Sequence, residues 1–191
     1  MNGLVFVLWV LLAVSPDARD LARRIRDGDR DAFRTFFDRH HGTLYGFLQS
    51  RGVSAADAED LVQNAFLYVW QHRDRIDPDR SLRAYLFRIG HTRALNHHRD
   101  AARVDPDATV DRTPSRDATP DAEALTREQR ARIDDAIADL PERRRMVARL
   151  CLVNGFTYQE AASVLDVARK TVENHMRLAL KDLRDALADL A

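Results

Sequence analysis

The 191-residue sequence is poor in cysteine, glycine, proline and lysine, and each scarcity excludes a class of protein. A single cysteine, Cys151, allows no internal disulfide and no cysteine-based zinc site, so we expect a reducing, cytoplasmic environment. Seven glycines and six prolines exclude collagen-like and Pro/Gly-rich disordered chains. The length allows one large domain or two small ones, and either can bury a core.

The charges are balanced in number but biased in type. There are 30 basic and 30 acidic side chains, and the basic set contains 28 arginines but only two lysines. The planar arginine fork suits phosphates and guanine edges, so this composition permits contact with nucleic acid. A GC-rich gene would produce the same ratio, and we favour that explanation for the overall bias. The positions of the charges are therefore more informative than their total.

The longest apolar run is Leu4–Val14 (LVFVLWVLLAV). As a helix it would span about 16 Å, roughly half of a bilayer's hydrocarbon core. No basic residue precedes it, and Pro16 follows Ser15 where a signal peptidase would cut, which disfavours a secretory signal. We interpret residues 1–16 as an apolar extension that arises from an over-extended gene start, in preference to a membrane anchor, and assign it no function.

Residues 17–103 follow helical periodicity almost throughout. Apolar side chains recur every three or four residues, which predicts helices with one face buried against a core. Gly28 and Gly52 interrupt the pattern and predict helix ends. Ser54, with Asp57 three residues later, predicts the N-cap of a further helix. No alternation typical of β-strands is present in this segment.

Residues 104–122 have a different composition. The stretch VDPDATVDRTPSRDATPD within this segment contains three prolines and five aspartates but only two valines that could be buried. Such a segment cannot offset the entropy lost on ordering, so it predicts a flexible linker. Helical periodicity resumes in residues 123–191. The sequence therefore predicts an all-α chain, with two small helical domains, 17–103 and 123–191, joined by the linker.

The second domain contains a helix-turn-helix pattern. Thr157 and Glu160 form a capping box at the start of a short helix. Asp166–Ala168 supplies a three-residue turn, in which aspartate tolerates the left-handed conformation. A second helix is expected from Arg169 to about Leu183. The helix lengths and the turn length are typical of a DNA-binding helix-turn-helix.

The second helix of this motif is polar over its first half. Its buried side is expected to comprise Val172, Met176 and Leu180, with Ala179. Its candidate DNA contacts are Arg169, Lys170, Thr171, Glu173, Asn174, His175 and Arg177. Such side chains can bond base edges and phosphates in the major groove. The alternative is a helical hairpin with a solvated charged face, and the same two explanations apply to Arg143, Arg144, Arg145 and Arg149 on the preceding helix.

Two helices of the first domain carry contrasting polar surfaces. The helix DAEDLVQNAFLYVW has outward acidic and amide residues at positions 57, 59, 60, 63 and 64 beside a thick apolar seam. The next helix, expected over residues 81–103, carries five arginines against one acid. Tyr85 and Phe87 are interleaved with these arginines. Basic charge combined with aromatic side chains is typical of surfaces that bind single-stranded or melting DNA.

Taken in order, these motifs resemble the extracytoplasmic-function (ECF) group of bacterial RNA polymerase sigma factors. DAEDLVQNAFLYVW is similar to the family's region 2.2, which docks on the coiled coil of the polymerase β′ subunit. SLRAYLFRIGHTRALNHHR is similar to regions 2.3 and 2.4, which melt and read the −10 promoter element. The segment from residue 140 to residue 184 resembles region 4, whose recognition helix reads the −35 element. Three motifs in the family's order form a more specific signal than a lone helix-turn-helix.

The resemblance implies a role for each matching residue. Those expected to face the core polymerase are Asp57, Asp60, Gln63 and Asn64. Those expected to contact the −10 strand are Arg83, Tyr85, Arg88, His91, Thr92, Asn96 and Arg99. The seven polar residues of the second domain's recognition helix would enter the −35 major groove. The family also implies promoter DNA and an anti-sigma factor as partners, with no cofactor, no metal and no catalytic residue.

Three positions depart from the family's pattern. Thr92 stands where the family commonly has asparagine at the turn that captures a flipped base, which puts the −10 specificity in doubt. Asp166 replaces the usual turn glycine. Ala161 stands where a larger aliphatic residue is preferred, which would loosen the packing of the first helix of the motif. None of these changes removes a motif.

Three other classes of protein compete with this interpretation. One is a module that binds only protein, which the five arginines of the helix expected over residues 81–103 weakly disfavour. LuxR-like regulators share the KTVENHM segment, but their partner receiver domains contain alternating strands and helices, which the first domain lacks. An enzyme is disfavoured because the sequence has no glycine-rich phosphate loop, no Gly-x-Ser-x-Gly elbow and no His-Glu-x-x-His. The adjacent pairs His40–His41 and His97–His98 point to different faces of a helix and make poor metal sites.

Overall fold

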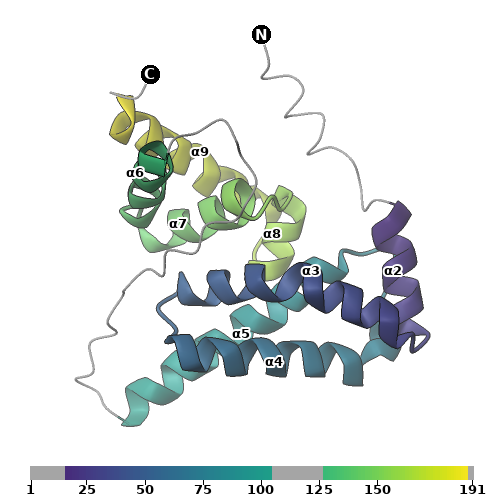
Figure 1. Ribbon diagram of the computed structural model, residues 1–191. Coiled ribbons are helices and arrows are strands. Elements are labelled where there is room, and N and C mark those ends of the chain that lie inside the picture. Colours follow the sequence, from purple (N-terminus) through teal and green to yellow (C-terminus); the bar gives the residue numbers. More distant parts are fainter. Residues whose placement is uncertain (1–15, 105–126, 189–191) are drawn as a thin grey trace. The chain divides into compact units, whose positions relative to one another are not determined.

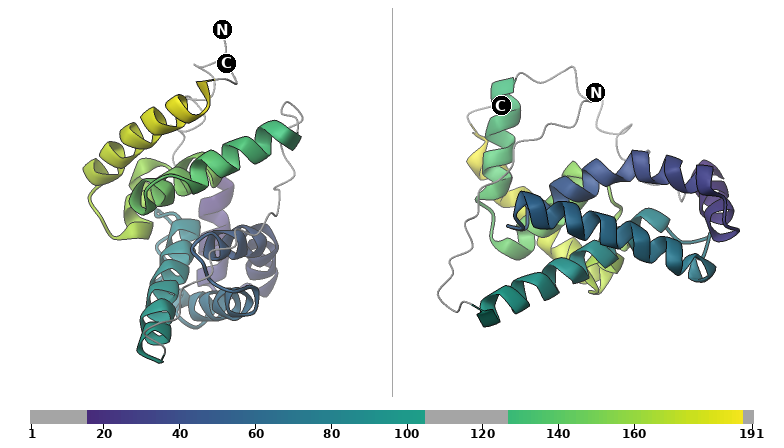
Figure 2. Two further views of the ribbon diagram at one scale, coloured as in Figure 1. Left: turned by 90° about the vertical axis from the view of Figure 1, so that its left-hand side faces the viewer. Right: turned by 60° about the horizontal axis from the view of Figure 1, so that its bottom comes forward.

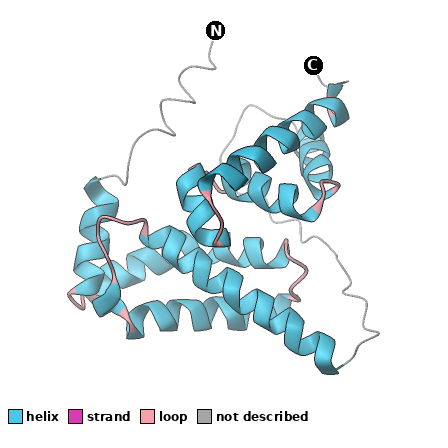
Figure 3. Cartoon of the chain, turned by 180° about the vertical axis from the view of Figure 1, so that it is seen from behind, coloured by secondary structure: helices cyan, strands magenta, loops and turns pink. Residues whose placement is uncertain are grey.

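The computed structural model describes residues 16–104 and 127–188, and within these ranges all regular structure is helical, as predicted (Figures 1 and 3). The contacts divide the chain into two units. Helices α2 to α5 belong to the first unit, and α6, α7, α9 and most of α8 belong to the second. The apolar run Leu4–Val14 and all of the expected linker beyond Val104, the last residue of α5, lie outside the described residues.

The described part of the first unit contains four α-helices and one 3₁₀ turn. They are α2 (Pro16–Arg26), α3 (Arg30–Gln49), α4 (Ala55–Gln71), η1 (Arg73–Arg75) and α5 (Leu82–Val104). The helix α3 contacts α2, α4 and α5, and α4 in turn contacts α5 (Figure 2). No helix in the described ranges of the chain is long and apolar enough to cross a membrane.

The expected helix ends of the first unit are confirmed. Gly28 and Gly52 have φ angles of 92° and 79°, which most side chains would disfavour. Ser54 caps α4, because its hydroxyl accepts a hydrogen bond from the Asp57 backbone N–H. The sequence analysis missed the cap of α3, where the Asp29 carboxylate accepts from the backbone N–H groups of the first turn.

Aromatic rings join the helices of the first unit at several points in its core. Phe66 of α4 lies 5.7 Å from Phe36 and 6.2 Å from Phe33 on α3, measured between ring centroids in edge-on arrangements. Phe87 of α5 is fully buried and lies 5.3 Å from Phe47. The prediction that Phe87 belongs to a DNA-stacking surface is therefore wrong, because its ring completes the contact between α3 and α5.

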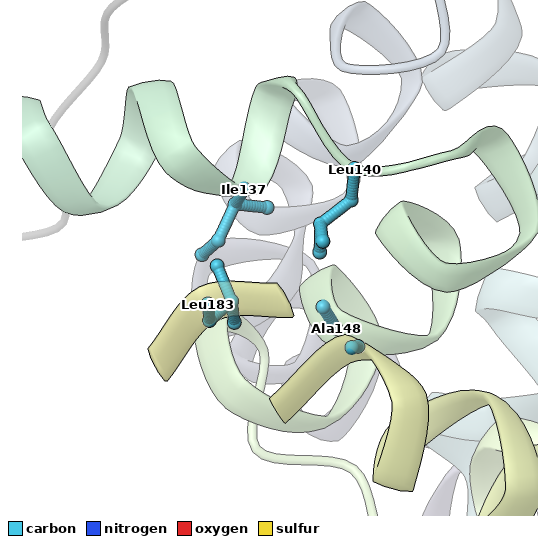
Figure 4. Packing of buried hydrophobic residues seen from close by; sticks show 5 residues of the cluster. Ile137, Leu140, Ala148 and Leu183 are labelled. Carbon is cyan, nitrogen blue, oxygen red and sulfur yellow. The ribbon is translucent and has the colours of Figure 1, made fainter. Parts of the chain in front are cut away.

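The second unit comprises shorter elements. They are α6 (Arg127–Ala138), α7 (Glu142–Ala148), the π-helical turn η2 (Arg149–Val153), α8 (Tyr158–Leu165) and α9 (Arg169–Ala186). An aliphatic cluster joins α6, α7 and α9, and Figure 4 shows four of its members pointing toward one another. Its buried residues are Ile137, Leu140, Ala148, Ala179 and Leu183.

The expected helix-turn-helix is present in the second unit. Thr157 and Glu160 form the full capping box at the start of α8. Asp166 adopts the left-handed conformation with φ of 55° and ends that helix. The prediction that Leu180 lies on the buried side of α9 is wrong, because 41% of it is exposed. Ala179 is buried, as predicted, and Leu183 faces the core in place of Leu180.

Candidate protein and nucleic-acid interfaces

One side of α4 presents an acidic and amide surface. Asp60, Gln63 and Asn64 are all exposed, and their three- and four-residue spacing places them on one side of the helix. Leu67 extends this side by one turn and is 51% exposed. The sequence analysis did not include Leu67, although its helical spacing from Gln63 and Asn64 is the signal that would have identified it.

Asp57 differs from the other members of that predicted set. It is half-buried at the start of α4, where its carboxylate accepts a 2.5 Å hydrogen bond from the Ser54 hydroxyl. The same carboxylate lies 3.5 Å from Nε2 of His97 on α5. These contacts connect the N-terminus of α4 to α5. Asp57 therefore has a structural role at the helix cap.

A polar surface also follows α5. Arg88, Thr92, Asn96 and Arg99 are exposed and recur at three- and four-residue intervals, so they share one side of the helix. Arg83 and Tyr85 lie at the start of the same helix and are half-buried. The Arg83 guanidinium lies 5.8 Å from the Phe87 ring centroid. Burial raises the pKa of Tyr85, so its hydroxyl remains protonated and can donate a hydrogen bond.

His91 lies apart from these exposed residues. Only 7% of it is exposed, and its Nδ1 has no hydrogen-bond partner in the described part of the chain. Burial, together with the nearby Arg51 charge, lowers its pKa to about 4. The imidazole is therefore neutral at physiological pH and belongs to the core, so we do not include His91 in the DNA-facing set.

A layered group lies between α4 and α5. The ring of Tyr68 stacks on that of His72, with their centroids 4.0 Å apart and their planes 21° apart. The Arg93 guanidinium lies over the Tyr68 ring at 5.6 Å from its centroid. All three side chains are half-buried. The sequence analysis missed this group, because its members come from two helices and only the fold brings them together.

The first half of α9 carries the predicted recognition residues. Arg169, Lys170, Asn174 and Arg177 are exposed, whereas Thr171, Glu173 and His175 are half-buried. The Glu173 carboxylate lies 3.0 Å from Arg169 Nε and 3.6 Å from Lys170 Nζ. Glu173 therefore orders the two cations at the start of the helix.

The N-terminus of α9 has no side-chain cap. Ala168 occupies the N-cap position and makes no side-chain hydrogen bond to the first turn. The Thr171 backbone N–H donates to the Ala168 carbonyl, whereas the N–H groups before it lack an intrahelical acceptor and carry partial positive charge. Together with Arg169 and Lys170, they form a surface suited to phosphate groups.

Two of the four arginines on the preceding elements make structural contacts. Arg144 pairs with Asp182 of α9, and Nε of Arg145 donates to the Leu140 carbonyl. Arg149 is half-buried, and that burial lowers its pKa. Only Arg143 is fully exposed. The described residues contain no group of His, Cys, Asp and Glu side chains arranged to hold a metal ion.

Comparison with known protein families gives two matches. The model of Sigma-70 region 2 matches residues 36–104, and the model of Sigma-70, region 4 matches residues 130–183. The chain is 30% identical to the RNA polymerase sigma factor CnrH of Cupriavidus metallidurans over 184 residues, which cover 88% of this chain and 94% of CnrH. It is also 30% identical to the ECF RNA polymerase sigma factor RpoE of Cereibacter sphaeroides over 172 residues, covering 88% and 93% of the two chains.

Solved structures give the same fold. The structure of CnrH in complex with the cytosolic domain of CnrY matches with a TM-score of 0.63 and 30% identity, covering 91% of this chain and 97% of CnrH. The sigma factor RpoE in complex with the anti-sigma factor NepR from Bartonella quintana matches with a TM-score of 0.64 and 24% identity, covering 82% and 96%. The second similarity concerns the fold alone.

Proposed function

Because this chain belongs to the ECF group of the sigma-70 family and is a sigma factor that directs RNA polymerase to promoters, we propose that its two units divide promoter recognition between them. The observation that carries this proposal is the presence of one basic, exposed helix surface in each unit. The surface of α5 lies within the region 2 match, and that of α9 lies within the region 4 match.

The exposed side of α4 is the proposed docking surface for the polymerase. Asp60, Gln63 and Asn64 offer hydrogen-bond acceptors and amides to the β′ coiled coil, and Leu67 adds an apolar contact among them. A polar interface with a central apolar side chain is typical of complexes that form and dissociate. Asp57 contributes indirectly, because its contacts fix the N-terminus of the helix.

The exposed side of α5 is the proposed −10 surface. Arg88 and Arg99 supply positive charge for the phosphates, while Thr92 and Asn96 supply hydrogen bonds for unpaired bases. Tyr85 adds a protonated hydroxyl at the start of the helix. Thr92 is shorter than asparagine and has a single hydroxyl, so we expect it to read a base at that position differently from an asparagine.

The N-terminal half of α9 is the proposed −35 surface. Asn174 and Arg177 are exposed and can reach base edges in the major groove. Arg169 and Lys170, ordered by Glu173, lie beside the uncapped helix N-terminus and can hold phosphates. Thr171 and His175 are half-buried at the edge of this surface.

The domain boundaries complete the proposal. Residues 17–103 and 123–191 would act as separate reading domains, and residues 104–122 would act as the tether between them. When one domain has docked on the polymerase, the tether raises the effective concentration of the other at its promoter element. Shortening the tether should therefore impair promoter use before it impairs the folding of either domain.

An anti-sigma protein is the proposed regulator. Two matching solved structures contain a sigma factor bound to a partner, the cytosolic domain of CnrY in one case and the anti-sigma factor NepR in the other. We place this protein in the cytoplasm, with the polymerase and the DNA, as a non-catalytic initiation factor. The comparisons do not favour the LuxR-like alternative, which would bind DNA as a dimer without polymerase.

Run-off transcription tests the proposal. Purified bacterial core polymerase is incubated with and without this protein on genomic fragments that include the upstream region of its own gene. Initiation at a defined start that requires the protein supports the proposal and maps the promoter. Sequence-specific DNA binding by the protein alone, without any dependent transcript, would support the dimeric regulator instead.

Two acidic residues, one on α4 and one on α3, provide the test variant and the matched control for the polymerase-docking surface. Asp60→Ala should reduce transcript at limiting protein concentration, and excess protein should restore it, because the substitution weakens docking only. Asp38→Ala removes an exposed acid from α3 and should leave the transcript unchanged. Equal effects of the two substitutions would contradict the assignment of the α4 surface.

A further inference from the structure

We propose that Arg93 binds a backbone phosphate of the unpaired −10 strand, and that Tyr68, stacked on His72, is the positioning residue that holds its guanidinium. This inference rests on the proposed −10 role of α5. It adds one contact to that surface and assigns a purpose to a group of side chains that neither the sequence motifs nor the comparisons single out.

The first observation is the order of the layered group. His72 follows Tyr68 by one helical turn on α4, so the two rings overlap, and the Nδ1 atom of His72 also lies 3.0 Å from the Tyr68 carbonyl oxygen. The Tyr68 ring therefore has little rotational freedom. Arg93 reaches this ring from α5, where the cation–π contact fixes the guanidinium on the neighbouring helix.

The second observation is that no acid compensates Arg93. Its side chain is half-buried, its Nε is enclosed without a hydrogen-bond partner, and no carboxylate pairs with it in the described ranges 16–104 and 127–188. Partial burial of a cation is costly unless an opposite charge or hydrogen bonds compensate it. The aromatic ring supplies part of that compensation, and an anion from outside the protein would supply the rest.

The third observation is the position of Arg93 on α5. It directly follows Thr92, and Asn96 lies three residues further, which places the two side chains beside each other on the helix. A phosphate bound by Arg93 would thus belong to a nucleotide whose neighbour faces Thr92 and Asn96. An arginine held at a fixed angle suits this role because its planar fork can engage two phosphate oxygens.

The test uses the complete protein bound to core polymerase. The probe is a fluorescent single-stranded oligonucleotide that carries the non-template −10 sequence of the promoter mapped by run-off transcription. Its dissociation constant is measured over a series of salt concentrations. Arg93→Ala should weaken binding about tenfold, as expected for a charge-assisted contact. It should also reduce the slope of log K against log salt by about 0.7, the value for one phosphate on a single strand.

Further variants separate positioning from structure. Tyr68→Phe retains the ring and should bind as the wild type does. Tyr68→Ala should weaken binding, and combining it with Arg93→Ala should add nothing, because Tyr68 acts through Arg93. Arg93→Lys should keep the salt slope but lose part of the affinity. Arg34→Ala, an exposed arginine of α3, is the matched control and should change neither quantity.

Two outcomes would overturn the inference. In the first, Arg93→Ala leaves affinity unchanged. In the second, it lowers both the melting temperature and the affinity but leaves the salt slope at the wild-type value, which would make Arg93 a clamp between α4 and α5. Failure of the wild-type protein to support any transcript or bind the oligonucleotide would refute the proposed function, and the inference with it.

Discussion

The two units differ in how many aromatic rings their cores contain. In the first, long helices pack through aromatic rings, and Phe66 alone lies against three phenylalanines of α3. In the second, shorter helices pack through the aliphatic cluster of Ile137, Leu140, Ala148, Ala179 and Leu183 (Figure 4). Aromatic side chains bury about 150–250 Å² each, so a few of them anchor a long helix. Alanines and leucines bury less, so the local signals at helix ends matter more in the second unit.

This difference matches the surfaces that the units present. The first unit holds two adjacent helices, α4 and α5, whose exposed sides need a fixed relation to each other, and large interlocked rings provide it. The second unit presents the start of one helix, α9. The capping box of α8 and the left-handed Asp166 determine where that helix begins. Four predictions test this contrast, from the largest expected effect to the smallest.

Phe36→Ala should unfold the first unit selectively. Phe36 is 2% exposed and contacts Phe66 edge-on, so its removal leaves a cavity and costs about 3–5 kcal/mol. Hydrogen exchange of the full chain, followed by mass spectrometry, reports each unit separately. Peptides from α3, α4 and α5 should lose protection, whereas those from α7 and α9 should not. Phe36→Leu is the control with a smaller expected loss, and equal loss of protection in both units would refute the contrast.

Acidification should destabilise the first unit before the second. Burial is the main reason why the pKa of His40 and that of His91 are lowered to about 4 from the ordinary 6.5. The folded unit keeps both rings neutral, whereas the unfolded chain binds protons below pH 6.5. Their contribution is therefore fully present above pH 6.5 and is lost as the pH falls toward 4, at up to about 1.4 kcal/mol per pH unit for each histidine.

Urea denaturation between pH 7 and pH 4.5 measures this effect, with hydrogen exchange assigning it to a unit. His41→Gln is the control, since His41 is exposed on the same helix, and it should leave the pH dependence unchanged. A first unit whose stability is constant over this range would show that the two buried rings are protonated without penalty.

Thr157→Ala should destabilise the second unit by about 1 kcal/mol. The substitution removes the hydroxyl that accepts from the Glu160 backbone N–H, and with it half of the capping box. Thermal unfolding should show the loss, and hydrogen exchange should place it in α8. Thr157→Ser preserves the hydroxyl and should restore most of the stability. A loss of equal size in Thr157→Ser would mean that the threonine methyl group, and not the cap, is responsible.

Leu180→Ala should have the smallest effect. Leu180 is 41% exposed, so truncation should change the free energy of unfolding by no more than about 0.5 kcal/mol. Leu183, one turn further along α9, is 8% exposed, and Leu183→Ala should cost about 2 kcal/mol or more. Chemical denaturation of the two variants compares them directly. A larger loss of stability in Leu180→Ala than in Leu183→Ala would mean that Leu180 lies on the buried side of α9, as predicted from the sequence.

The features that were predicted correctly depend on local chemistry. The capping residues Ser54 and Thr157, the turn at Asp166 and the interruptions at Gly28 and Gly52 each act within a few residues along the chain. Helical periodicity likewise needs only one helix at a time. The all-α class and the order of the motifs followed from such signals, and the family comparison confirms them.

The features that were missed depend on contacts between helices. The buried side of α9 is determined by α6 and α7, which place Leu183 in the core in place of Leu180. His91 and Arg93 illustrate the same limit on α5, because a helix turns by about 100° per residue. The side chain of His91 enters the core, whereas that of Arg93, two positions further along, lies over Tyr68 at the boundary with α4.

The thiol of Cys151 can report the opening of the second unit. Cys151 is the only cysteine in the sequence, it is half-buried in η2, and burial raises the pKa of its thiol to about 12. Because the thiolate is the reactive species, alkylation is slow while the unit is closed. The rate of alkylation of Cys151 therefore reports the opening of the second unit alone. It can be measured in the intact chain, also while the first unit is bound to a partner. The opening of the second unit can thus be followed without cutting the protein or introducing a further cysteine.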